Sequence, residues 1–278
     1  MARSRLWNRF RRNPGALAGG LIVLLVLFMA VFAPLLAPYD PEDRDFARRF
    51  QAPSPQHLLG TDHFGRDNLS RLVLGSRISI QVGLLSVGLA VLIGVTLGAL
   101  AGYLGGGVDS LISRTVDVFL AFPPILLALA LVAALGPSVS SVIIALGLVY
   151  WTTYARVVRS SILALREEEF VEASRALGAG WVRTLFRHIL PNAIGPLLVV
   201  ATVGIGNAIT AEAALSFLGL GVQPPTPTWG GIVNTGLQFL RQSAYISTFA
   251  GLAIMVTVLG FNLLGDGLRD VLDPRRGR

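Results

Sequence analysis

The residues best suited to chemistry lie between positions 172 and 192, where the chain reads EASRALGAGWVRTLFRHILPN. Glu172 offers a carboxylate that an arginine of another protein can bind. Trp181 and Leu185 offer an apolar anchor of the kind that dominates protein interfaces. The segment combines charge with helix-forming residues in a chain that is otherwise mostly apolar. The chemistry it predicts is recognition of a partner protein.

Local spacing in this segment predicts two short helices joined at a glycine elbow. Gly178 and Gly180 are expected to end the first helix, because glycine tolerates the left-handed backbone that closes a helix. Trp181 and His188 follow at helical spacing, and the second helix is expected to stop at Pro191. The result is a polar helical hairpin.

The elements that must position this hairpin are membrane spans. Of the 278 residues, 53% are hydrophobic and 14% are charged, whereas about a quarter of the residues in soluble domains are charged. All 23 basic residues are arginine, and the net charge is +7. The arginines cluster beside apolar runs, which fits a membrane rather than nucleic acid. Cysteine is absent, which excludes disulfides and thiolate chemistry.

Long stretches without charge mark the spans. There are five of them, at residues 13–39, 78–108, 118–155, 189–211 and 242–265. Each exceeds the roughly 20 residues that cross a bilayer. The third is long enough for two spans that turn at Gly136 and Pro137. The sequence therefore predicts an all-α integral membrane protein with six transmembrane helices.

Arginine placement predicts the orientation of these helices. Three groups of arginines lie before the first span, after the fourth span and in the tail. With six spans all three groups fall on one side, and the positive-inside rule makes that side cytoplasmic. Both termini are therefore expected in the cytoplasm. A secretory signal peptide is the alternative for the first span, but its apolar run is too long for one.

These limits divide the chain into five parts. They are a cytoplasmic interfacial segment at 1–14, the first transmembrane helix at 15–38, an extracytoplasmic segment at 39–77, a core of five transmembrane helices at 78–268 that includes the hairpin loop at about 164–190, and a cytoplasmic tail at 269–278. Small residues in the second span favour close helix contacts: Gly83, Gly88, Gly94, Gly98 and Gly102. Pro123 and Pro124 are expected to start the third span or to bend it.

Glu212 is the only carboxylate deep within an apolar stretch. An acid at mid-membrane costs about 2.5 to 3.5 kcal/mol on insertion scales, so its side chain is expected to face the interior or the outer mouth. Two roles stay open. The carboxylate lines a path through the membrane and meets the amino group of a passing solute, or it bridges helices.

The outer segment pairs acids with arginines around glycine turns. Its members are Asp62, Arg66, Asp67 and Arg71. We expect them to form a structural salt-bridge network, with contact to a solute as the alternative. His57 and His63 suggest a nickel site, because imidazole suits that metal. No metal site is expected, since the spans supply no further histidine.

The hairpin pattern resembles the EAA loop of the membrane subunits of binding-protein-dependent ABC importers. The matching residues are Glu172-Ala173-Ser174, then Gly178, then Ile189-Leu190-Pro191. Ser174 departs from the family, which usually has a second alanine there, but a small residue replaces a small one. An isolated triplet would be weak evidence, whereas the spacing to the glycine and the proline is specific.

Three further segments resemble one subfamily of these permeases. They read WNRFRRNPGALAG, HLLGTDHFGRDNLSRLVLGSRISI and EAALSFLGLGVQPPTPTWG. They are similar to the shorter membrane subunit of the dipeptide, oligopeptide and nickel permease group. With the hairpin, the resemblance covers nearly the whole chain.

The resemblance implies a type I ABC importer permease fold and a multi-pass protein of a bacterial or archaeal inner membrane. It implies import of di- and oligopeptides delivered by an extracytoplasmic binding protein. A related second permease subunit, two cytoplasmic ATPases and membrane lipid are the implied partners, and nucleic acid is not. In that family the loop forms coupling helices that sit in a groove of the ATPase. The implied coupling residues are Glu172, Ala173, Ser174, Gly178, Trp181, Leu185, His188 and Pro191.

The chain is not expected to be an enzyme. It has no glycine-rich phosphate loop, no HExxH and no GxSxG pattern. It is expected to bind no cofactor, so ATP and magnesium belong to the partner ATPases. Nickel, glutathione or another small solute is the alternative cargo. Rivals from other classes are a secondary transporter with Glu212 as proton relay, and a receptor or assembly scaffold.

Overall fold

The computed structural model describes residues 9–272, which are mainly helical, with longer irregular segments before Asn68 and before Trp229. The long helices are α2 (Pro14–Val31), α4 (Asn68–Leu104), α7 (Val139–Leu165), α10 (Leu190–Phe217) and α12 (Ala244–Leu272). The short ones are α3 (Ala33–Leu36), η1 (Phe46–Arg48), α5 (Gly106–Leu120), α6 (Pro124–Leu135), α8 (Glu169–Ala176), α9 (Trp181–Thr184), η2 (Leu185–Ile189) and α11 (Trp229–Gln238). Most of the expected interfacial segment and of the expected tail lies outside the described residues.

Within the described range, five helices are long and apolar enough to cross a membrane, and the number is six if a bent pair of helices is counted as one span. The bent pair is α5 with α6, which meet at 88°. The third span, expected from residue 118 onward with Pro123 and Pro124 starting it or bending it, is bent at this point. Pro123 and Pro124 cause the break, because neither has an N–H to donate and Pro124 occupies the first turn of α6.

α4 begins at Asn68, well before the expected start of the second span at Ile78. Asp67 caps it, since its Oδ2 accepts from the backbone N–H of Ser70 at 2.7 Å. An N-cap of this kind satisfies one of the amides that a helix start leaves unpaired. The membrane limits of the span remain a prediction, because the helix is longer than a bilayer needs.

α4 and α7 pack backbone to backbone along their inner halves. A Cβ on Gly98 would lie 2.5 Å from the carbonyl oxygen of Ala155, and one on Gly94 would lie 2.7 Å from that of Trp151. Only glycine permits this approach. Gly88 differs from the other small residues of this helix, because nothing lies within 4 Å of its position.

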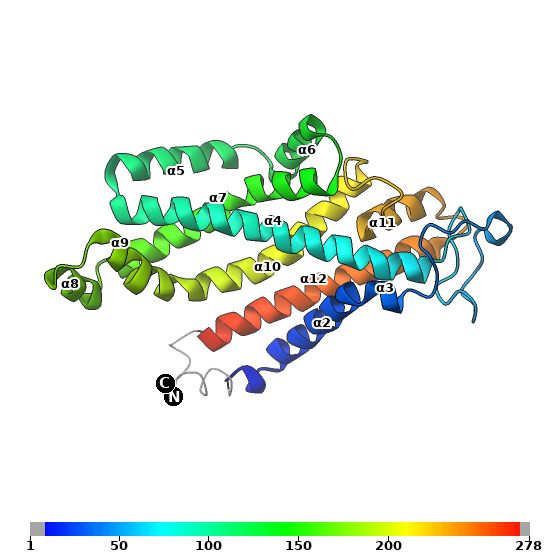
Figure 1. The fold of residues 1–278 in the computed structure, drawn as a ribbon, viewed down its shortest axis with the longest axis horizontal. Helices are drawn as coiled ribbons and strands as arrows, with labels where there is room; N and C mark the ends of the chain where they lie inside the picture. The colour runs from blue at the N-terminus through cyan, green and yellow to red at the C-terminus, as the bar shows by residue number, and fades with distance from the viewer. Residues whose placement is uncertain (1–8, 273–278) are drawn as a thin grey trace.

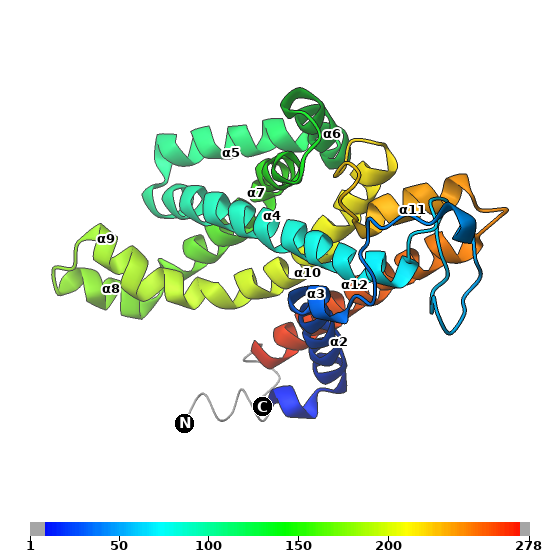
Figure 2. The same cartoon turned by 45° about the vertical axis from the view of Figure 1, so that its right-hand side comes forward.

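Figure 1 shows α4, α10 and α12 running along the longest axis of the molecule. α8 and α9 lie at one end of the axis, and α11 with the loop before α4 lies at the other. In both Figure 1 and Figure 2, α5 and α6 lie on one side of α4, and α2 lies on the opposite side of α4. The start of α2 meets the end of α12, where Asn13 donates to Asp270 at 3.2 Å. The start of α2 and the end of α12 thus lie beside each other.

Candidate coupling site

The hairpin between α7 and α10, residues 169–189, consists of α8, a turn and α9 with η2. The turn closes α8 with two backbone hydrogen bonds. Ala179 N–H donates to Ser174 at 3.1 Å, and Gly178 N–H donates to Arg175 at 2.9 Å. This pair of bonds is the Schellman motif, which needs a left-handed residue after the helix. Gly178 supplies it with φ +81°, as the glycine elbow predicts.

One face of the hairpin is buried against the inner halves of α4 and α7. The hairpin contributes Val171, Leu185 and Ile189 to this cluster, and α4 and α7 contribute Ala99, Val158 and Ile162. Leu185 is 1% exposed. The expectation that Leu185 anchors a partner directly is therefore wrong, because its side chain fills the chain's own core. Leu185 and Val171 instead fix the hairpin to the two central helices.

The other face of α8 is exposed. It presents Phe170, Glu172, Ala173 and Leu177, and Leu177 is 89% exposed. Among the ion pairs of the described residues none involves Glu172. Ser174, by contrast, is buried on the inner face beside Val171. A free carboxylate beside exposed apolar side chains has the composition of a docking surface.

Aromatic contacts hold the turn against the inner end of α4. The rings of Tyr103 and Trp181 lie 6.3 Å apart, and the guanidinium of Arg175 lies 5.7 Å from the Tyr103 ring. Trp181 remains about half exposed. His188 is half-buried, and its carbonyl accepts from the Asn192 amide at 2.6 Å. Trp181 therefore serves both the fold and the exposed surface.

The second arm does not stop at Pro191, contrary to the sequence prediction. One apolar helical stretch runs from Trp181 to Phe217. η2 is a π-helical turn, after which the N–H of Leu190 donates to Leu185, five residues back. Pro191 then lies in the first turn of α10, where a missing N–H is tolerated. The wide turn lets the hairpin continue directly into a span.

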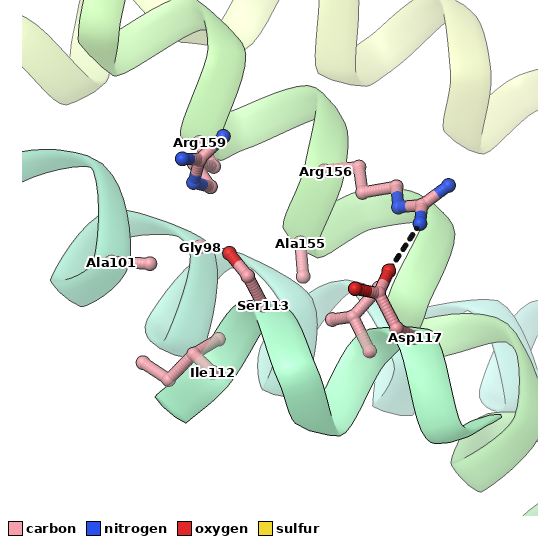
Figure 3. Close-up of a pocket in the computed structure, with 9 residues that line it drawn as sticks. Gly98, Ala101, Ile112, Ser113, Asp117, Ala155, Arg156 and Arg159 are labelled. Carbon is pink, nitrogen blue, oxygen red and sulfur yellow. Dashed lines mark hydrogen bonds and ion pairs between the residues drawn. The ribbon is translucent and has the colours of Figure 1, made fainter. Parts of the chain in front are cut away.

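Two ion pairs join α7 to α5 above the hairpin. Arg159 donates to both carboxylate oxygens of Asp109, and Arg156 donates to Asp117 at 2.9 Å. Figure 3 shows the second pair at the edge of a cavity of about 300 Å³ between α4, α5 and α7. These pairs were not predicted from the sequence. A signal was present, because Asp109 and Asp117 are the only acids between residues 68 and 166.

Glu212 is fully buried at the outer end of α10. Its Oε1 accepts from the Ser216 hydroxyl at 2.8 Å, and its Oε2 accepts from the Ser79 hydroxyl at 3.4 Å. Ser79 also accepts from the backbone N–H of Trp229 at 3.2 Å. The carboxylate thus bridges α10, α4 and the start of α11. Of the two roles left open by the sequence, the structure favours the bridge.

The outer network differs from the expected one in its membership. Asp62 accepts from Arg66 at 2.7 Å, and Arg71 lies 3.7 Å from the same carboxylate. Asp67 pairs with neither arginine. It caps α4 and lies 2.9 Å from Nδ1 of His57. The expected four-membered network is therefore two separate buried groups.

The two outer histidines contact other side chains of the chain itself, and the His57 ring lies 5.0 Å from the ring of Tyr39. The His63 ring stacks on Phe239 at 4.9 Å, which ties the segment before α4 to the end of α11. Burial lowers the pKa of His63 from its ordinary value of 6.5, and it outweighs the opposing effect of Asp62. Among residues 9–272, no group of three or more metal-binding side chains is close enough to hold an ion.

Comparison with known proteins identifies the family. Residues 94–278 match the family described as "Binding-protein-dependent transport system inner membrane component". Residues 3–53 match the "N-terminal TM domain of oligopeptide transport permease C". The chain belongs to the family of binding-protein-dependent transport system inner membrane components. As a member of this family it is a permease subunit of an ABC importer, a multi-pass protein of the bacterial inner membrane.

Two curated relatives of this permease subunit cover almost all of the chain. The dipeptide transport system permease protein DppC of Alkalihalophilus pseudofirmus is 46% identical over 97% of this chain and 88% of its own length. The glutathione transport system permease protein GsiD of Pectobacterium atrosepticum is 45% identical over 97% and 90%. A chain of the MetNI methionine ABC transporter, solved in an inward-facing conformation, matches with a TM-score of 0.62 at 20% identity, over 74% of this chain and 97% of its own. That match supports the type I fold of the permease subunit.

Proposed function

We propose that this permease subunit imports short peptides and that the hairpin at residues 169–189 couples it to a cytoplasmic ATPase. A related second permease subunit completes the membrane path. Two ATPase subunits bind ATP and magnesium, and an extracytoplasmic protein delivers the peptide. The chain itself catalyses no reaction. It forms one half of the membrane path and changes conformation when the ATPases move.

The observation that carries this proposal is the division of the hairpin into two faces. Val171 and Leu185 bury one face in the chain's own core, while Leu177 and Glu172 leave the other face uncovered. A partner that binds the uncovered face therefore moves the hairpin together with α4 and α7, against which the hairpin packs. An arginine of the ATPase is the expected partner of Glu172, and an apolar pocket is expected to receive Leu177.

Motion of the hairpin is transmitted by packing. The buried cluster joins it to the inner halves of α4 and α7, and the Arg159–Asp109 ion pair joins α7 to α5. Packed cores move as bodies and do not deform continuously. When ATP draws two ATPase subunits together, these helices therefore rock as one unit and change which side of the membrane the path faces.

The names of the relatives support a peptide as the cargo. One relative is a dipeptide permease and another is a glutathione permease, at nearly equal identity. Glutathione is itself a tripeptide, so both names indicate small peptides. Glutathione is the second candidate, and the binding protein is expected to choose between the two.

The environment of Glu212 argues against a proton-coupled secondary transporter. Its two carboxylate oxygens accept hydrogen bonds from Ser216 and Ser79, and the side chain has no exposed surface. A proton relay needs a group that exchanges protons with water on each side in turn. Glu212 lacks that access.

The test is purification of the chain together with the proteins encoded beside it, followed by reconstitution into lipid vesicles. We expect ATPase subunits to co-purify, and labelled dipeptide to enter the vesicles only when ATP and the binding protein are present. Competition by glutathione separates the two candidate cargoes. Uptake that persists without ATP and stops when the proton gradient is collapsed would contradict the proposal.

A further inference from the structure

A second cavity lies on the inner half of the membrane region, between α7, α10 and α12. Its volume is about 300 Å³, the lower limit of the range of about 300 to 1,000 Å³ that is usual for small-ligand sites. The polar side chains in its wall are Tyr150, Thr153, Tyr154, Asn207, Asp266 and Arg269. None of them belongs to the hairpin or to the Glu212 bridge.

The deeper wall carries uncharged hydrogen-bonding groups inside membrane helices. Asn207 and Thr153 are both exposed, although each lies well within a candidate span. A polar side chain that faces lipid has no partner and is unfavourable there, so such residues face a partner or a water-filled cavity. Their position in the wall of this cavity therefore indicates that the cavity holds water or a polar solute.

Gly204 keeps the Tyr154 hydroxyl in this wall. The hydroxyl lies so close to Gly204 that any Cβ there would collide with it. Tyr154 is otherwise buried between α4 and α10. The glycine thus turns a core tyrosine into a polar group of the cavity.

The inner rim carries one charge of each sign. Asp266 and Arg269 lie one turn apart on α12, and both are exposed. Neither takes part in any ion pair among the described residues. A carboxylate suits an ammonium group, and a guanidinium suits a carboxylate. A free peptide carries both of these groups.

We propose that this cavity is the inner part of the translocation path and binds a short zwitterionic peptide. Asp266 binds the amino terminus and Arg269 binds the carboxylate. Asn207 and Thr153 bind the peptide amides. The inference rests on the proposed function and adds the residues that meet the cargo, in place of Glu212.

A zwitterionic lipid headgroup carries the same two charges and is the competing occupant. A headgroup at Asp266 and Arg269 would place its acyl chains against Asn207 and Thr153. Hydrocarbon contact leaves those polar groups unpaired, which is unfavourable. A peptide gives them hydrogen-bond partners, and the geometry therefore favours a peptide.

The chain has no cysteine, so single cysteines report on this cavity directly. The unsubstituted complex is first reconstituted and shown to hydrolyse ATP and take up dipeptide. The same complex is then prepared with Asn207→Cys or Thr153→Cys. A charged, membrane-impermeant thiol reagent is added on the side of the ATPases. Leu24→Cys is the control, because Leu24 is exposed on the apolar helix α2, outside the cavity.

We expect Asn207→Cys to react at least about tenfold faster than Leu24→Cys, since the thiolate is the reacting form and an apolar environment disfavours it. A free tripeptide should slow the reaction at least about twofold, and the same peptide with both ends capped should not. Thr153→Cys gives the same readout if Asn207→Cys does not assemble. Reaction as slow as the control, or protection that follows the lipid composition and not the peptide, would overturn the inference. Because dipeptide uptake is measured first, these failures would leave the proposed function standing.

Charge variants test the rim separately. Asp266→Asn and Arg269→Gln should each raise KM for a free dipeptide severalfold, with a much smaller effect on a peptide capped at the end that the residue binds. Arg114→Gln is the matched control, since Arg114 is an exposed arginine of α5 outside the cavity. Equal effects on free and capped peptides would contradict the assignment of the two ends.

Discussion

Arg159 on α7 donates to both carboxylate oxygens of Asp109 on α5, at 2.5 and 2.7 Å, although the two residues lie 50 positions apart. This contact joins the helix that enters the hairpin to the first half of the broken third span. Movement of α7 therefore carries α5 with it.

Arg159→Gln should weaken this link. The pair is partly buried and doubly bonded, so its loss is expected to cost about 0.5 to 1 kcal/mol. Uptake should fall more than ATP hydrolysis, because the link transmits motion. The control is Arg156→Gln, whose pair with Asp117 is 58% and 67% exposed and should matter less. Equal effects of the two variants on uptake would contradict this role for Arg159.

The glycines of α4 offer a matched pair for stability. Gly98→Ala places a Cβ 2.5 Å from the Ala155 carbonyl oxygen, and such overpacking is expected to cost about 1 to 3 kcal/mol. Gly88→Ala meets nothing within 4 Å and should stabilise the helix by about 0.5 to 1 kcal/mol. Thermal unfolding in detergent measures both. A Gly88→Ala variant as unstable as Gly98→Ala would mean that α4 packs through a different face.

The turn of the hairpin should be sensitive to backbone strain. Gly178 and Gly136 have φ of +81° and +83°, and no atom lies within 4 Å of the position of either Cβ. Alanine at either position should cost about 1 kcal/mol of strain. Only Gly178→Ala should lower uptake while ATP hydrolysis continues. Gly136→Ala should not, since Gly136 lies at the outer turn between α6 and α7. Comparable loss of coupling in both variants would refute a specific role for the hairpin turn.

Glu212 should be a structural residue. Glu212→Leu leaves the hydroxyls of Ser79 and Ser216 without their acceptor, at about 1 to 3 kcal/mol for each buried group. We expect reduced assembly of the complex. Glu212→Gln retains an acceptor oxygen and should keep most of the uptake. If Glu212→Gln assembles normally but abolishes uptake, Glu212 is not merely structural and lines the translocation path.

The sequence was sufficient for the family, for the all-helical membrane fold and for the glycine turn of the hairpin. Hydropathy and arginine placement are local signals, and Gly178 ends α8 as its position predicts. The burial of Leu185 was not predictable in this way, because the same helical spacing fits a face turned to a partner or to α4 and α7. The structure shows which face Leu185 occupies, because Val158 and Ile162 of α7 pack beside it.

Contacts between distant segments were also beyond sequence reasoning. Asp67 stands one residue from Arg66, yet it binds His57 and the start of α4. Pro191 predicted a helix end, but the π-turn of η2 carries the helix past it. The partner of Asp67 was therefore set by how the chain folds back, and the continuation past Pro191 by the local π-turn.

The central claim is that the exposed face of α8 binds an ATPase subunit, and site-directed crosslinking tests it most directly. In the purified complex, a photoactivatable reagent attached to Leu177→Cys should crosslink to an ATPase subunit, and ATP should change the yield. Leu24→Cys should give no such product. If Leu177→Cys gives no ATPase product while the complex remains intact and active, the hairpin does not couple this permease to ATP hydrolysis.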